Sequence, residues 1–321
     1  MNKNRNNIKN ELPVVSVVMN CLNGEKYLKE AIDSVFAQTF KNWEIVFWDN
    51  NSIDASAEIA KEYGCKVKYF RSESTYSLGK VRNLALQKTR GKYVGFLDVD
   101  DLWLPTKLEK QLALFKTNQK LGMVYSSVVI FDENGDQFVE FRHTKKRGYI
   151  FGDLLERNFI GPSTTLYKKS VLDSLDRTFD EKYTMLMDLD LSLRVAYNFE
   201  IDFIDEPLAK WRNHQGNITR TKRFLAPKEH KVLLDRLYNE IPNVKIRYKN
   251  QLLVYKRNFH MTMAREEWSK GNGAETRKQL HPYLRIPKVF LIYLCTWFMS
   301  YTFYETFKES RLEKILQYLR R

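Results

Sequence analysis

Cysteine is scarce in this chain of 321 residues. The three cysteines, Cys21, Cys65 and Cys295, lie far apart and are odd in number. They therefore form neither the disulfide framework of a small secreted protein nor a Cys-x-x-Cys metal site. We expect the protein to work in a reducing compartment, the cytoplasm.

Other sequence features are missing as well. Residues 1–12 are rich in Asn and Lys and lack the apolar core of a signal peptide, so they are predicted to be a loose tail. The chain contains no internal repeat and no recognised DNA- or RNA-binding module, which argues against nucleic acid as the partner. No glycine-rich phosphate loop follows the first predicted strand, which argues against a nucleotidyltransferase.

Negative charge is scarce only in the last third of the chain. Residues 1–205 contain 29 Lys and Arg against 29 Asp and Glu, whereas residues 206–321 contain 24 against 10. The whole net charge of +14 therefore belongs to the last third. A neutral front and a basic back predict chemistry in the first part and attachment to something anionic in the second.

Apolar runs alternate with helical patterns from the start of the chain. The first four predicted strands are 14–19, 44–48, 66–70 and 93–97, with helices between them. This alternation predicts an α/β fold with a mostly parallel sheet. Further along we expect strands at 123–131, 137–141, 162–168, 201–204 and 208–211, and helices at 105–116 and 187–199. Beyond Arg220 the pattern is helical, which predicts a main domain over 13–220 and a basic helical region over 221–321.

One buried run ends in a cluster of carboxylates. Residues 93–97 lack the alternation of a half-exposed strand, and Asp98, Asp100 and Asp101 follow directly. Ligands of α/β sheets bind beyond the carboxyl ends of the strands. An Asp-x-Asp pair there can bind Mg²⁺ or Mn²⁺, whose other ligands would be phosphate oxygens. An isolated motif of this kind is better explained by a polar turn at the start of a helix, so its context decides.

Five motifs supply that context, in order, between about residues 13 and 220. They are Val-Ser-Val-Val-Met-Asn20-Cys-Leu-Asn23, Trp-Asp49-Asn-Asn-Ser-Ile-Asp54, Leu-Gly-Lys-Val-Arg82-Asn83, Leu-Asp98-Val-Asp100-Asp101 and Met-Asp188-Leu-Asp190-Leu-Ser-Leu-Arg194. Together they resemble the family-2 nucleotide-sugar glycosyltransferases of the bacterial surface-glycan type. The resemblance implies the GT-A fold, a Rossmann-like sheet flanked by helices, here with a C-terminal helical appendage. It also implies an inverting transferase that uses a nucleotide-diphosphate sugar and a divalent metal.

The resemblance assigns donor-binding roles to residues at the predicted sheet edge. Asn20 would contact the base or ribose, Asp49 would accept the N3–H of uracil or thymine, and Arg82 would reach the nucleotide. Asp98 would bind the ribose hydroxyls. Leu22 stands where the family often has an aromatic residue, which leaves the base open, with a UDP-sugar as the expected donor. The alternatives are structural roles. Asn20 would be a turn residue, Asp49 a turn or helix-cap residue, and Arg82 a solvated charge on a helix.

The resemblance also assigns the chemistry. Asp100 would bind Mn²⁺ or Mg²⁺, which would stabilise the departing diphosphate. His214, in an Arg-x-His element after the last predicted strand, would complete the metal shell or contact the diphosphate, with a surface-loop histidine as the alternative. Asp188 would be the general base that takes the proton of the acceptor hydroxyl, with a helix cap as the alternative. Ser163 and Thr164 would line the donor-sugar or acceptor pocket, although a buried strand explains them equally well.

A run without charged residues, 289–304, interrupts the basic region. Its sixteen residues are fewer than the roughly 20 that span a bilayer, seven of them are aromatic, and Lys and Arg flank it on both sides. We therefore expect residues 285–321 to lie on the anionic inner face of the cytoplasmic membrane. A seam between copies in a homo-oligomer and a helix packed on the main domain are the alternatives.

The sequence therefore predicts a hexosyl- or N-acetylhexosaminyltransferase that acts on a glycan or lipid-linked acceptor in cell-surface polysaccharide synthesis. A catalytically degenerate protein that binds a nucleotide-sugar, or scaffolds a glycan assembly complex, is the alternative. The carboxylates at 98, 100 and 188 favour the enzyme.

Overall fold

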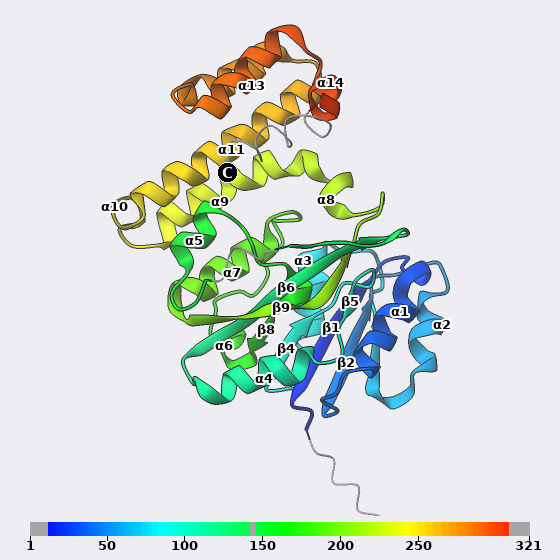
Figure 1. Ribbon diagram of the computed structural model, residues 1–321. Coiled ribbons are helices and arrows are strands. Elements are labelled where there is room, and N and C mark those ends of the chain that lie inside the picture. The colour runs from blue at the N-terminus through cyan, green and yellow to red at the C-terminus, as the bar shows by residue number, and fades with distance from the viewer. Residues whose placement is uncertain (1–11, 141–145, 308–321) are drawn as a thin grey trace, which may run out of the picture. The chain divides into compact units, whose positions relative to one another are not determined.

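The computed structural model describes residues 12–140 and 146–307 (Figure 1). The predicted loose tail 1–12 therefore lies outside the described residues except for residue 12. The chain divides into two compact units, Met1–Thr221 and Lys222–Arg321. The first unit is a sheet flanked by helices, and the second is helical.

In the described part of the first unit, nine strands form one sheet. The strand order is β3-β2-β1-β4-β8-β6-β9-β5, and β7 pairs with β6. The strands are β1 (Val15–Cys21), β2 (Trp43–Asp49), β3 (Val67–Arg71), β4 (Tyr93–Phe96), β5 (Leu102–Trp103), β6 (Leu121–Asp132), β7 (Gly135–Glu140), β8 (Leu166–Lys168) and β9 (Glu200–Arg212). The helices are α1 (Glu25–Phe36), α2 (Ser56–Glu62), α3 (Leu78–Leu86), α4 (Lys107–Thr117), α5 (Phe151–Glu156), α6 (Lys169–Asp173), α7 (Met187–Asn198) and α8 (Ile218–Thr221).

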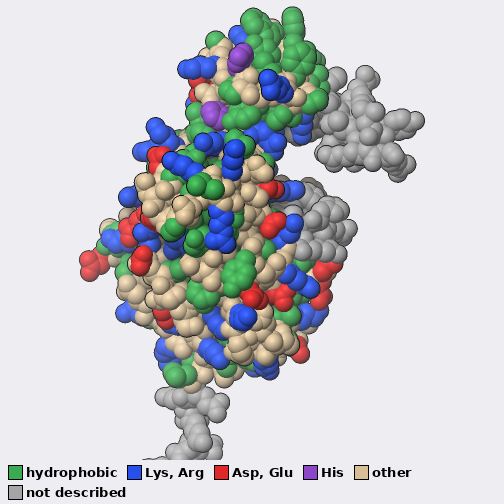
Figure 2. Space-filling view, turned by 90° about the vertical axis from the view of Figure 1, so that its left-hand side faces the viewer, with side chains coloured by type: hydrophobic (Ala, Val, Ile, Leu, Met, Phe, Trp, Pro, Cys, Tyr) green, Lys and Arg blue, Asp and Glu red, His purple; other side chains and the backbone are tan. Residues whose placement is uncertain are grey.

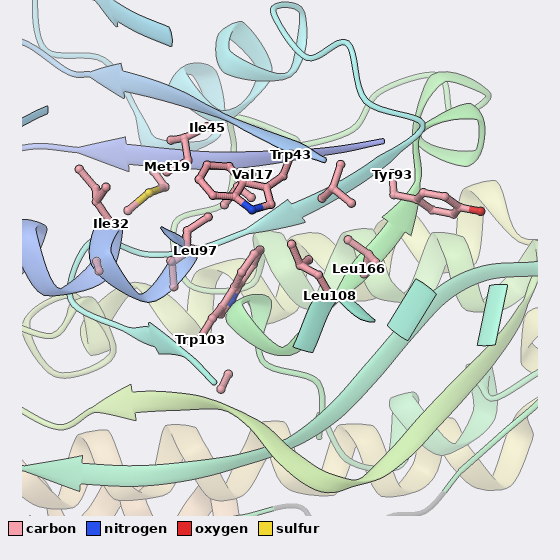
Figure 3. Close-up of a cluster of buried hydrophobic side chains, with 14 of the residues drawn as sticks. Val17, Met19, Ile32, Trp43, Ile45, Tyr93, Leu97, Trp103, Leu108 and Leu166 are labelled. Atoms are coloured by element: carbon pink, nitrogen blue, oxygen red, sulfur yellow. The ribbon is translucent and has the colours of Figure 1, made fainter. Parts of the chain in front are cut away.

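The first half of the sheet is parallel, as the alternation of strands and helices predicts. β1 pairs in parallel with β2 and β4, and β2 pairs in parallel with β3. Figure 3 shows Met19 of β1 beside Ile32 of α1, within a buried cluster that also contains Val17 and Ile45. α3 packs against β1 and β2, and buried side chains of α1 belong to the same cluster as those of β1 and β2, so both strands are buried along almost their whole length. That burial explains why their sequences are apolar without alternation.

The second half of the sheet is mixed. β8 runs antiparallel to β4 and β6, β5 runs antiparallel to β9, and β6 and β9 are parallel. The two predicted strands 201–204 and 208–211 are one strand, β9, whose pairing with β6 shifts register near Pro207. Proline has no N–H to donate to the neighbouring strand, which explains why the pairing is irregular at this position.

Other predicted elements need correction. Within the predicted strand 162–168, residues Pro162–Thr164 form a 3₁₀ turn, and only Leu166–Lys168 is a strand. β5, α5 and α6 were not predicted. The last residue of the predicted strand 137–141 lies outside the described residues.

The second unit confirms the predicted C-terminal helices. They are α9 (Ala226–Glu240), α10 (Val244–Arg247), α11 (Lys249–Ser269), α12 (Gly273–Leu280), α13 (Pro287–Phe298) and α14 (Tyr301–Phe307). Ala264 and Trp268 of α11, Leu280 of α12, and Val289 and Ile292 of α13 form its buried cluster. Over the residues that the structure describes, no helix combines the length and apolar character needed to cross a bilayer.

Candidate active site

The carboxyl ends of the parallel strands place several predicted residues at one edge of the sheet. Asn20 and Asp49 lie at the ends of β1 and β2, where Cys21 and Asp49 are paired neighbours. Asp98 follows two residues after β4 ends, and β4 is the other neighbour of β1. Ligand sites of α/β sheets form at this edge.

Arg82 of α3 brings two of the predicted carboxylates together. Its Nη1 donates to Oδ1 of Asp188 at 2.6 Å, and its Nη2 donates to Oδ1 of Asp98 at 2.8 Å. The guanidinium is buried, with the rings of Phe96 and Phe179 at 6.0 and 5.3 Å. Three elements far apart in sequence therefore meet in one ion-pair network, in which each carboxylate has one fixed oxygen.

Asp188 lies in the first turn of α7, as expected. Burial raises the pKa of the Asp188 carboxyl, and the positive charge of Arg82 opposes that shift. The carboxyl is thus a better proton acceptor than a solvated aspartate, while Arg82 keeps it in one orientation. Its side chain is still 28% exposed, so a hydroxyl group can reach the second oxygen.

Asp100 and His214, the two predicted metal ligands, are in contact. Nε2 of His214 lies 2.9 Å from Oδ2 of Asp100, and the backbone N–H of Gly216 donates to Nδ1 at 3.1 Å. Because Nδ1 accepts a hydrogen bond, Nε2 carries the proton and donates it to Asp100. A metal at Nε2 would require the loss of this proton.

The donor set fits a divalent metal only in part. Among the described residues no group of three or more His, Cys, Asp and Glu side chains could hold a metal ion. Asp100 and His214 offer one carboxylate and one imidazole, a mixed set that suits Mn²⁺ better than Mg²⁺, which prefers oxygen. Two protein ligands leave most coordination positions to other molecules.

Asp101, the residue after Asp100, is buried and has its partners within the protein. Its Oδ2 accepts from the hydroxyl of Ser163 at 2.5 Å, and its Oδ1 accepts from the backbone N–H of Arg212 at 3.1 Å. Burial and the nearby Asp100 raise the pKa of the Asp101 carboxyl well above its usual range. Thr164, also buried, donates its hydroxyl to the carbonyl of Gly161. Both predicted pocket hydroxyls thus have partners within the protein, and their role towards a sugar stays a prediction.

The two predicted base-binding residues differ in their surroundings. Nδ2 of Asn20 is buried and has no hydrogen-bond partner, so its capacity to donate is unused within the protein. Asp49 is fully buried, and its oxygens already accept from the N–H of Ser52, the hydroxyl of Tyr69 and Nη1 of Arg71, at 2.7, 2.6 and 3.1 Å. Asp49 therefore orders the loop after β2, and a base could reach it only after these partners move.

Arg212 belongs to the site as well, although the sequence predicts a role only for His214 in the same Arg-x-His element. Its Nε donates to the carbonyl of Asp100 at 3.0 Å, and its Nη2 donates to Glu30 at 2.8 Å. The rings of Tyr27 and Phe131 each lie 4.4 Å from the guanidinium carbon. Arg212 thereby ties the acidic loop to α1 and β6. The signal was present, since Arg212 stands two residues before His214 in the same short stretch.

A pocket of about 310 Å³ opens beside His214. Its lining residues are Tyr27, Asp132, Glu133, Asn134, Arg212, Asn213, His214, Gln215 and Arg220. Both signs of charge and several amides line it, so a polar ligand fits it better than an apolar one.

The comparisons with known proteins decide the family. The family model described as glycosyl transferase family 2 matches residues 16–176, half of the chain. The chain belongs to glycosyl transferase family 2. An uncharacterized glycosyltransferase of Methanocaldococcus jannaschii is 36% identical over 224 residues, which are 66% of this chain and 75% of that protein. A UDP-Glc:α-D-GlcNAc-diphosphoundecaprenol β-1,3-glucosyltransferase of Escherichia coli, WfgD, is 26% identical over 72% of this chain and 89% of its own.

Solved structures of low sequence identity have the same fold. TarS of S. aureus, residues 1–349 with UDP-GlcNAc, has a TM-score of 0.57 at 20% identity and covers 88% of this chain and 90% of its own. The mannosyltransferase PcManGT of Pyrobaculum calidifontis, with GDP-Man and Mn²⁺, has a TM-score of 0.63 at 12% identity, over 94% and 85%. The predicted GT-A fold is thereby confirmed, and this glycosyltransferase shares it with enzymes of different donors.

Proposed function

We propose that this family-2 glycosyltransferase transfers a sugar from a nucleotide-diphosphate donor, a UDP-sugar, to a hydroxyl of a glycan or lipid-linked acceptor, with inversion, in surface-polysaccharide synthesis. The observation that carries the proposal is the Arg82 network, which holds Asp188 and Asp98 beside the Asp100–His214 pair. WfgD by its name uses UDP-Glc and a diphosphoundecaprenol-linked acceptor, and TarS binds UDP-GlcNAc, which supports the donor and acceptor classes.

In the proposed reaction Asp188 accepts the proton of the acceptor hydroxyl. The hydroxyl oxygen forms a bond to the anomeric carbon from the face opposite the leaving group, so the configuration inverts. The bond from that carbon to the diphosphate oxygen breaks, and its electron pair stays on the diphosphate. Mn²⁺ or Mg²⁺, held by Asp100 and His214, would supply electrostatic stabilisation of that leaving group when bound. Asp98 and Asn20 would orient the ribose and base.

Free cysteines support a cytoplasmic place for this reaction. Cys21, Cys65 and Cys295 are all unpaired in the structure. Unpaired thiols are typical of a reducing compartment.

A comparison of Asp188→Asn with wild-type protein tests the proposed base. We expect the rate of UDP release in the presence of acceptor to fall by about 10²- to 10⁴-fold, because the amide cannot take the proton. Stabilisation by UDP-sugar and Mn²⁺ in a thermal-shift assay should persist. Asp173→Asn, at an exposed carboxylate of α6, is the matched control and should retain wild-type activity.

The same assay separates the enzyme from a degenerate binding protein or scaffold. Wild-type protein that is stabilised by UDP-sugars but transfers sugar to no acceptor would favour the binder. Thermal shifts with UDP, dTDP and GDP sugars identify the nucleobase of the donor. Asp100→Ala should remove the metal-dependent part of the shift. A shift that is indifferent to metal would overturn the metal role of Asp100.

A further inference from the structure

From Val289 onwards α13 has apolar side chains on all sides, but the second unit covers only one of these sides. Val289, Ile292 and Thr296 are buried, and the first two pack in the cluster with Trp268 and Leu280. A helix that is apolar all round is normally buried all round. The remaining sides of α13 therefore need an explanation.

The outer face of α13 consists of Phe290, Leu291, Leu294, Trp297 and Phe298. These side chains are between 39% and 85% exposed. Successive helical residues are about 100° apart, so the five share roughly one third of the helix circumference, opposite the buried side. Figure 2 shows hydrophobic side chains gathered at the upper end of the view, at the height of α13 in Figure 1. Phe303 of α14 is exposed as well.

Positive charge accompanies this face. Arg285, two residues before α13, and Lys288, in its first turn, are exposed, and the guanidinium of Arg277 lies 3.8 Å from the ring centroid of Trp297. No acidic residue occurs from 276 to 304. An apolar face bordered by cations complements a bilayer with anionic headgroups, where acyl chains and negative charge lie a few ångströms apart.

We propose that the outer face of α13 inserts into the interfacial layer of an anionic phospholipid bilayer, with the helix axis in the membrane plane. α13 has twelve residues and is about 18 Å long, short of the roughly 30 Å hydrocarbon core. Tryptophan and aromatic side chains favour the depth at which headgroups meet acyl chains. The inference concerns binding alone and does not depend on the proposed reaction.

Vesicle co-sedimentation of the full-length protein tests this inference. Vesicles of phosphatidylcholine with one third phosphatidylglycerol, at low ionic strength, should bind the wild-type protein, and high salt should weaken the binding. Phe290→Ser/Phe298→Ser should lower the partition coefficient by about tenfold or more, because two large apolar side chains leave the contact. Ile246→Ser, at an 80% exposed apolar residue of α10, is the matched control and should bind as wild type does.

Trp297 gives a second readout. Phospholipids brominated along the acyl chain should quench part of the tryptophan fluorescence of the wild-type protein, and Trp297→Phe should remove that quenching while binding persists. Wild-type protein that ignores anionic vesicles, or a double variant that binds them as tightly as wild type, would overturn the proposal. A wild-type dimer that the double variant converts to monomers, without vesicle binding, would assign the face to a second copy. Vesicle binding that occurs only after removal of residues 308–321 would mean that these C-terminal residues, and not a membrane, occupy the outer face of α13.

Discussion

At the scale of single residues, Arg82 determines how Asp188, the proposed base, and Asp98, proposed to bind the donor, lie relative to one another. It is buried and contacts Asp98 and Asp188 through different nitrogens, and Nη1 also lies 3.3 Å from the sulfur of Met187. A planar guanidinium can bridge two carboxylates in fixed directions, whereas an ammonium is a single point of charge. The geometry therefore depends on arginine, and not only on a positive charge.

Arg82→Lys should impair both stability and catalysis. We expect the free energy of unfolding to fall by about 2 kcal/mol, less than for a fully buried pair because both carboxylates are partly exposed. The charge and hydrogen bond of Arg82 oppose the rise that burial causes in the pKa of Asp188. An ammonium cannot bridge both carboxylates in the same way, so its weaker contact with Asp188 should raise that pKa further and move the acidic limb of the pH–rate profile to higher pH. Urea unfolding and initial rates between pH 5 and 9 measure the two effects.

Arg71→Lys is the control for that measurement. Arg71 pairs with Asp49 from a side chain that is far more exposed than Arg82. Arg71→Lys should lower the free energy of unfolding by much less than Arg82→Lys does, and it should leave the pH–rate profile unchanged. An acidic limb that stays put in Arg82→Lys would show that Arg82 does not act on the base.

At the scale of elements, the sequence predicts those strands and helices that have long apolar patterns. The strands β1, β2 and β4 and helices α4 and α7 could be recognised because burial on both faces, or on one helical face, repeats along the chain. β5 has two residues and exists only because Leu102 and Trp103 pair with β9, more than a hundred residues later. Such an element leaves no periodic signal.

The candidate site shows the same division. The cluster of Asp98 and Asp100 could be found because it follows a buried strand, whereas Asp188 was singled out by the resemblance of its motif to the family. The contacts of Asp49 with Tyr69 and Arg71 depend on the register of β2 with β3, and those of Arg212 depend on where β9 ends beside the acidic loop. Local sequence patterns do not determine strand register or long-range pairing, so the partners of Asp49 and Arg212 could be identified only from the structure.

Packing between β4 and β5 links the fold to the site. A Cβ on Gly95 would lie 2.7 Å from the ring of Trp103, whose Nε1 donates to the carbonyl of Ser163 at 2.8 Å. Gly95→Ala should therefore displace Trp103 and the neighbouring acidic loop. We expect the free energy of unfolding to fall by about 1–3 kcal/mol, with a loss of transferase activity, measured by urea unfolding and UDP release.

Gly161→Ala is the matched control for Gly95→Ala. A Cβ there would meet only Cγ2 of Thr164, at 3.8 Å, an ordinary contact. This variant should unfold within about 0.5 kcal/mol of wild type. Equal stability of the two variants would contradict the packing argument.

At the scale of the whole molecule, the second unit has a partly buried histidine of its own. The candidate active site belongs to the first unit, whereas His230 belongs to the second. Nδ1 of His230 lies 2.8 Å from the hydroxyl of Tyr255, and the ring of Phe259 lies 5.6 Å away. Burial lowers the pKa of His230 to about 4 from its ordinary value of 6.5.

This histidine should make the second unit sensitive to acid. Between pH 6.5 and 4 the unfolded chain binds a proton that the folded unit does not, so the free energy of unfolding falls as the pH falls. The loss should reach about 2 kcal/mol at pH 5 relative to neutral pH and about 3 kcal/mol below pH 4. Hydrogen exchange of peptides from α9 and α11 at pH 7 and pH 5 measures it for this unit alone. His230→Gln should remove the difference in protection between pH 7 and pH 5. The control His281→Gln, at an exposed histidine, should retain it. Identical acid responses of His230→Gln and wild type would mean that another group destabilises the unit.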